Sequence, residues 1–112
     1  MSLTGHPLLS LRHLQPGWGI DELDAEQCKE FLAKWEKRSR LTWAELNTHT
    51  KHGLGSEKLP RRIFKPTVPE PLAQDEYKVM RHQGNLPFAG IQAGDLFYVL
   101  WIEQRYNTLY DH

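Results

Sequence analysis

The stretch that decides the fold is Glu76–His112, EYKVMRHQGNLPFAGIQAGDLFYVLWIEQRYNTLYDH. Side chains alternate in character from Tyr77 to His82, which predicts a strand, and Gln83-Gly84-Asn85 supplies a turn. A second strand is predicted from Leu86 to Gln92. Its proline and glycine suggest an irregular or bulged course.

The third strand of this segment is the strongest local prediction. After the turn Ala93-Gly94-Asp95, seven apolar residues follow without interruption, Leu96–Ile102. An apolar run without alternation is typical of a strand that is buried on both faces. We therefore expect it to lie centrally in an antiparallel meander, with helices on one face and aromatic packing on the other. The chain then closes on a polar Tyr110-Asp111-His112 tail.

Helices are predicted upstream of the sheet. Asp24 with Gln27 forms a capping box, and Thr42 with Glu45 forms a second one. Two helices so close together predict an αα-hairpin over residues 24–52. The first helix has an apolar stripe with spacings of three and four residues, made of Cys28, Phe31, Leu32 and Trp35.

The remaining segments have weaker patterns. Residues 1–20 are irregular, with a possible short edge strand from Leu8 to Leu14. Residues 53–75 form a basic, proline-rich connection from the helices to the sheet, because their prolines exclude a long helix. We predict a single α+β domain, 1–112, in which the hairpin packs on a C-terminal antiparallel sheet of three to four strands, residues 76–112.

Composition narrows the class of protein. Among 112 residues, 39% are apolar and 25% charged, which favours a packed core. The single cysteine, Cys28, cannot form an internal disulfide or a thiolate metal site, so a reducing, cytoplasmic setting is expected. No apolar run reaches the roughly 18 residues of a membrane span. Net charge is zero, but residues 34–65 hold nine basic and three acidic groups. This basic band indicates either a solvated helix face or a surface for nucleic acid.

The pattern as a whole resembles the RelE/ParE superfamily of toxins from bacterial type II toxin–antitoxin operons, in its ParE-like branch. The resemblance covers residues 24–112. It is carried by the helical hairpin with its segment LTWAEL at 41–46, by YKVMR at 77–81, by FYVLWI at 97–102 and by the closing LYDH at 109–112.

The resemblance implies a toxin that cuts mRNA on the ribosome without a metal or cofactor and that a cognate antitoxin neutralises. In such relatives the 2′-hydroxyl attacks the adjacent phosphate, and a C-terminal Tyr or His assists proton transfer. Arg81 matches the strand arginine that binds phosphate, and Tyr110 or His112 matches the acid/base position. The expected RNA-binding residues are Lys58, Arg61, Arg62, Lys65, His82 and Arg105.

Other functions remain open at this level. The middle strand reads Leu86-Pro87-Phe88 where many nucleolytic members have a second arginine. This leaves room for an inactive member, or for a ParE-like toxin that inhibits DNA gyrase without cutting RNA. A small interaction domain, paired with a partner along an exposed outer strand of the meander, is a third possibility.

Each proposed catalytic residue also has a structural alternative. His112 could belong to a frayed tail, and the Tyr110 ring could pack against the sheet instead of exchanging protons. Arg81 could form a structural ion pair with an acidic residue such as Glu103. The sequence leaves the oligomeric state open.

Overall fold

The computed structural model describes residues 3–51 and 53–112, and it has an α+β fold built on one five-stranded mixed sheet of order β1-β5-β4-β3-β2. The strands are β1 (Leu8–Ser10), β2 (Glu57–Pro60), β3 (Glu76–Arg81), β4 (Pro87–Ala93) and β5 (Leu96–Ile102). The helices are α1 (Ala25–Ser39) and α2 (Trp43–Leu46), with 3-10 turns η1 (Ile20–Glu22), η2 (Arg61–Ile63) and η3 (Glu70–Leu72). No helix among the described residues is long and apolar enough to cross a membrane.

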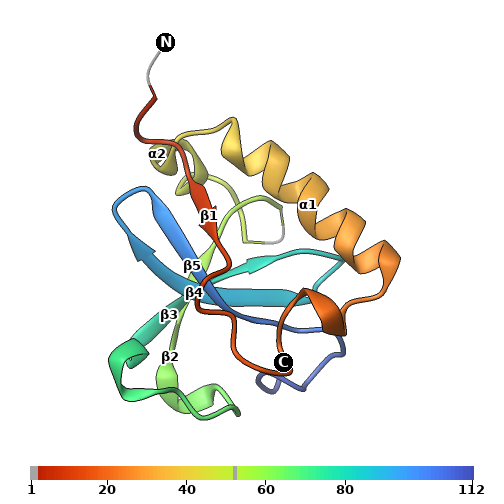
Figure 1. Ribbon diagram of the computed structural model, residues 1–112. Coiled ribbons are helices and arrows are strands. Elements are labelled where there is room, and N and C mark those ends of the chain that lie inside the picture. The colour runs from red at the N-terminus through yellow and green to blue at the C-terminus, as the bar shows by residue number, and fades with distance from the viewer. Residues whose placement is uncertain (1–2, 52) are drawn as a thin grey trace.

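The sheet separates two apolar cores. Figure 1 shows α1 and α2 on one side of the sheet and the connection between β2 and β3, with η2 and η3, on the other. On the helical side Phe31 and Trp35 pack against Phe88 and Phe97. The other side holds a second aromatic core, made of Phe64, Tyr77, Trp101 and Tyr110. Both faces of β5 are thus covered, as its uninterrupted apolar sequence predicts, although β4 is the middle strand.

A bulge in β5 divides that strand between the two cores. Gly90 pairs with Val99 and Ala89 pairs with Trp101, so Leu100 is an extra residue without a partner on β4. Val99 therefore points to the helical core, whereas Trp101 points to the other core. A Cβ at position 90 would lie 2.0 Å from the Tyr98 carbonyl oxygen, so only glycine permits this approach. The irregularity predicted for Leu86–Gln92 is present as a register shift between Ala89 and Gly90, although the extra residue lies on β5.

The strand count and direction differ from the prediction. The edge strand β1 forms, but it ends at Ser10 instead of reaching Leu14, and it pairs with β5 in parallel. The opposite edge is β2, which lies inside the segment predicted as an irregular connection. Pro60 can end this strand because an edge position needs no donor on its outer side. The sheet is therefore mixed, not purely antiparallel, and it has five strands.

The predicted helical hairpin is only partly present. Both capping boxes form, and α1 begins where Asp24 accepts a hydrogen bond from the Gln27 backbone at 2.8 Å. However, α2 is a single turn, because after Leu46 the chain has no apolar residue to pack on the sheet until Leu54. The prediction extends the hairpin to residue 52, but α2 ends at Leu46; residue 52 itself lies outside the described residues.

The buried face of α1 also differs in composition from the predicted apolar stripe. Leu32 is 60% exposed, whereas Arg38, which follows Trp35 at helical spacing, is fully buried. The Arg38 guanidinium donates to the Leu54 carbonyl at 2.9 Å and to the Arg81 carbonyl at 2.8 Å. It also lies over the ring of Phe88. Burial lowers the pKa of Arg38 to about 10. A cation of the basic band thus ties α1 to the loop before β2.

Candidate functional site

The three predicted catalytic residues gather at one end of the sheet, on the side away from the helices. Arg81 is the last residue of β3, while Tyr110 and His112 belong to the segment that returns after β5. Burial raises the pKa of Tyr110, and the neighbouring Arg81 charge opposes that rise. Residues separated by about 30 positions in the sequence therefore share one site.

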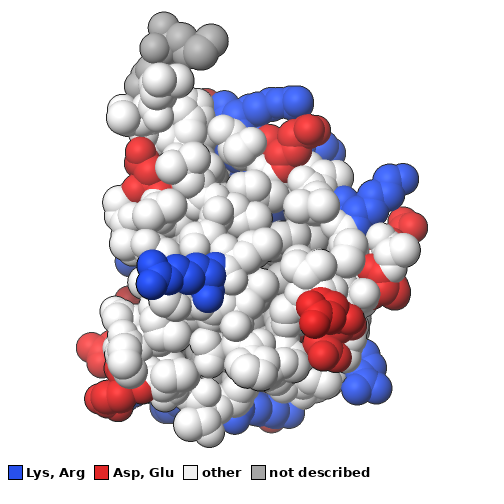
Figure 2. All heavy atoms as spheres, viewed as in Figure 1, with Lys and Arg blue, Asp and Glu red and all other residues white. Residues whose placement is uncertain are grey.

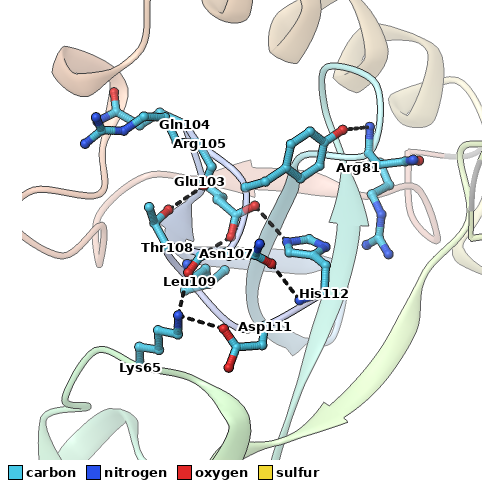
Figure 3. Close-up of polar contacts among 12 residues, drawn as sticks. Lys65, Arg81, Glu103, Gln104, Arg105, Asn107, Thr108, Leu109, Asp111 and His112 are labelled. Carbon is cyan, nitrogen blue, oxygen red and sulfur yellow. Dashed lines mark hydrogen bonds and ion pairs between the residues drawn. The ribbon is translucent and has the colours of Figure 1, made fainter.

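Glu103 is the centre of this site, and Figure 3 shows its contacts. It follows β5 directly and is fully buried. One carboxylate oxygen accepts the Leu109 backbone N–H at 2.9 Å, and the other lies 2.8 Å from Nε2 of His112. The backbone N–H of Glu103 donates to the Pro87 carbonyl at 2.9 Å. The buried carboxylate therefore holds the whole C-terminal segment against the end of the sheet.

His112 is held on several sides. Its ring stacks on Tyr110, with 4.6 Å between the ring centroids, and the Tyr106 ring lies perpendicular to it with the centroids 5.4 Å apart. Its backbone N–H donates to the Asn107 side chain at 2.8 Å, while its side chain remains 22% exposed. The frayed-tail alternative is therefore wrong, because the imidazole has a fixed place and still meets solvent.

The Glu103–His112 pair is suited to proton transfer. A neutral imidazole that donates its Nε2–H to a carboxylate keeps Nδ1 as a proton acceptor. The carboxylate fixes the tautomer and the orientation of the ring, and it stabilises positive charge that forms on the ring during a reaction. Of the predicted catalytic residues, only His112 combines a fixed orientation with contact to solvent.

Arg81 occupies a buried position. It is 6% exposed and forms an ion pair with Glu57 of β2 at 3.2 Å. The predicted partner Glu103 is therefore wrong, although the ion pair itself is present. Its Nε and Nη1 atoms are buried and have no hydrogen-bond partner. Because solvent does not reach these atoms, Arg81 cannot clamp a phosphate in this conformation.

Tyr110 supports the site through its ring. The ring packs between His112 and Phe64, and its buried hydroxyl lies beside the Arg81 side chain. This is the packing alternative that the sequence left open. Tyr110 therefore fixes the His112 ring from one side and has no path to a substrate in this conformation.

The predicted RNA-binding residues fall into separate groups. Lys65 borders the site, since its ammonium lies 2.8 Å from Asp111 and donates to the Asn107 carbonyl at 2.6 Å, and the exposed Arg105 lies in the same loop (Figure 3). Arg61 and Arg62 are exposed on η2. Lys58 lies on β2 beside a different hollow. On the face drawn in Figure 2, basic and acidic side chains are interspersed, so no single basic patch covers it.

His82 is not available to RNA. It is fully buried on the helical side of the sheet, near the rings of Phe31 and Phe88. Its Nε2 lies 2.7 Å from the Glu103 carbonyl oxygen, to which it donates as the neutral tautomer. His82 therefore exposes no atom that could carry the predicted RNA-binding role in this structure. Instead, His82 helps to fix the backbone that carries the Glu103 carboxylate.

The burial of His82 makes the fold sensitive to acid. Burial lowers its pKa to about 4, against about 6.5 in an unfolded chain. Between these two values the unfolded state binds the extra proton, so stability falls as pH falls. From about pH 7 to pH 5 the His82 contribution should lower the free energy of unfolding by about 2 kcal/mol. Urea unfolding at both pH values should show a smaller loss in His82→Gln than in the exposed control His49→Gln. Equal losses in the two variants would contradict this role.

Glu103 was named from the sequence only as a possible ion partner, and its real part in the site was missed. A signal was present: a carboxylate directly follows seven apolar residues of a strand buried on both faces. A charge in such a place needs a partner.

The sequence matches no protein-family model, and no curated protein and no solved structure matches the chain either.

Proposed function

We propose that this chain is the toxin of a type II toxin–antitoxin pair and acts as a ribosome-dependent, metal-independent mRNA endonuclease. The observation that carries the proposal is the pair formed by the buried Glu103 carboxylate and the solvent-accessible His112 imidazole. A fixed, solvent-accessible imidazole can act as the general acid/base that RNA cleavage through the 2′-hydroxyl requires.

The proposed reaction uses few residues. His112 takes the proton of the 2′-hydroxyl as its oxygen attacks phosphorus, the bond to the 5′-oxygen breaks, and a 2′,3′-cyclic phosphate forms. The proton is returned to the leaving oxygen, either by His112 or by water. Lys65, which borders the site through Asp111, is the cation that we assign to the charge on phosphorus. Arg81 and Tyr110 hold the site from within instead of touching RNA, which revises the roles that the resemblance implies.

Inducible expression followed by mapping of RNA ends tests this function. Wild-type protein should arrest growth and leave cleaved transcripts on ribosomes, and co-expression of the cognate antitoxin should relieve the arrest. His112→Asn should neither arrest growth nor leave cleaved transcripts, while the exposed control His49→Asn should behave like the wild type. Growth arrest with DNA-damage signalling and intact transcripts would favour the gyrase-inhibiting alternative instead.

The interaction-domain alternative loses its structural argument. It requires an open outer strand on the meander, and β3 is paired with β2 while β5 is paired with β1. The actual edges are strands of three and four residues, which offer a partner few free backbone groups. If expression of the protein has no effect on growth, transcripts or gyrase, that result would favour the interaction-domain alternative.

A further inference from the structure

A hollow lies at the other end of the sheet from the Glu103–His112 pair. Its volume is about 430 Å³, within the range of sites for small molecules. It is lined by Lys58, Gln74, Asp75, Glu76, Lys78, Gly90, Ile91, Gln92 and Gly94. The site described above uses none of these residues.

Two lysines face each other in the hollow. Lys58 of β2 and Lys78 of β3 are directly opposite in the antiparallel register, so their side chains emerge on the same face. Neither makes an ion pair among the described residues. Like charges placed opposite each other destabilise a sheet, and an anion bound between them would remove that cost. Burial and the Lys58 charge both lower the pKa of Lys78, in agreement with an uncompensated pair.

Lys78 is held in place before any ligand arrives. Its ammonium lies 4.7 Å from the centroid of the Trp43 ring and donates to the Gln92 side-chain oxygen at 2.7 Å. Both partners are neutral, so the positive charge is oriented but not neutralised. A fixed cation loses less conformational entropy when it binds an anion than a free lysine does.

Carboxylates line the neighbouring part of the same hollow. Glu76 is two residues before Lys78 on β3, so it points to the same face roughly 6.6 Å along the strand. The backbone here is anchored: the Asp75 carbonyl accepts from Arg61 N–H at 2.9 Å, and Gln74 N–H donates to the Tyr77 hydroxyl at 3.1 Å. Carboxylates accept hydrogen bonds from hydroxyl groups, and they repel a second phosphate.

We propose that this hollow binds one ribonucleotide, with its phosphate between Lys58 and Lys78 and its ribose hydroxyls on Asp75 and Glu76. A cationic half and an anionic half, side by side, match a nucleoside monophosphate better than they match a simple anion. The site is separate from the Glu103–His112 pair and does not depend on RNA cleavage.

Isothermal titration of the full chain with 5′-AMP tests the proposal, with amide chemical shifts to locate the ligand. The expected result is saturable binding with shifts at Lys78, Glu76 and Gln92. Lys78→Gln and Lys58→Gln should each weaken binding about tenfold, as expected for a lost charged hydrogen bond, whereas the exposed Lys29→Gln on α1 should not. Because Lys58 is exposed, its variant gives a result even if the change at Lys78, which packs on Trp43, impairs folding.

Two comparisons make the assignment specific. 5′-dAMP and adenosine should each bind about tenfold more weakly than 5′-AMP, because one lacks a ribose hydroxyl and the other lacks the phosphate. Absence of binding, equal binding of inorganic phosphate and 5′-AMP, or equal binding of 5′-AMP and 5′-dAMP would overturn the proposal. Binding should be unchanged in His112→Asn, so failure of the nuclease function and failure of this site are distinguishable.

Discussion

His112→Asn should reduce the rate of mRNA cleavage on ribosomes by roughly 10²–10⁴-fold, the range for loss of a positioned general acid/base. Asparagine is shorter than histidine, and its amide cannot take up a proton near neutral pH. The fold should survive, because the Leu109 N–H still satisfies the other Glu103 oxygen. Single-turnover cleavage of ribosome-bound mRNA, with His49→Asn as the matched control, measures the effect.

Glu103→Gln sharpens this prediction. The glutamine can keep an acceptor for the Leu109 N–H, but its amide group then faces Nε2 of His112 and favours the opposite tautomer. Cleavage should fall at least about 10²-fold, while the fold keeps its neutral hydrogen bonds. Full activity in either variant would contradict the proton-transfer role of His112. Loss of activity together with unfolding in Glu103→Gln would leave His112→Asn as the deciding variant.

Glu57→Ala should destabilise the fold by about 3 kcal/mol, the lower end for breaking a buried ion pair. The loss is large because Arg81 would remain charged and buried, with Nε and Nη1 already lacking hydrogen-bond partners. It should stay at the lower end because Glu57 is 23% exposed and also pairs with Lys51. Urea unfolding of the variant against wild type measures the change.

Arg81→Met is the matched partner of this experiment. It removes the charge and fills similar volume, so its cost in stability should be small, and combining it with Glu57→Ala should recover most of the lost stability. It also separates the two roles of Arg81. If Arg81 only supports the site, Arg81→Met should cleave RNA at a rate within a few-fold of wild type. If Arg81 binds phosphate, the variant should lose roughly 10²-fold or more in cleavage rate. A double variant as unstable as Glu57→Ala alone would contradict the ion-pair account.

The β-meander was predictable because its signals are local. The turns around Gly84 and Gly94 and the apolar run of β5 follow from neighbours in the sequence. Capping boxes are equally local, and both formed where Asp24 and Thr42 predict them. In contrast, β2 was missed because a strand of four residues ending in proline has no periodicity of its own and forms by pairing with β3.

The candidate site was likewise predictable from the sequence only in part. Sequence alone determined the α+β class, the meander and the presence of Arg81, Tyr110 and His112 near the end of the sheet. Only the tertiary structure decided their roles, because burial and partner choice depend on segments far apart in the chain. Glu57, 24 residues before Arg81, forms the ion pair that neutralises the arginine. Glu103, buried by the returning tail, orients His112 and leaves it as the one member of the three that meets solvent.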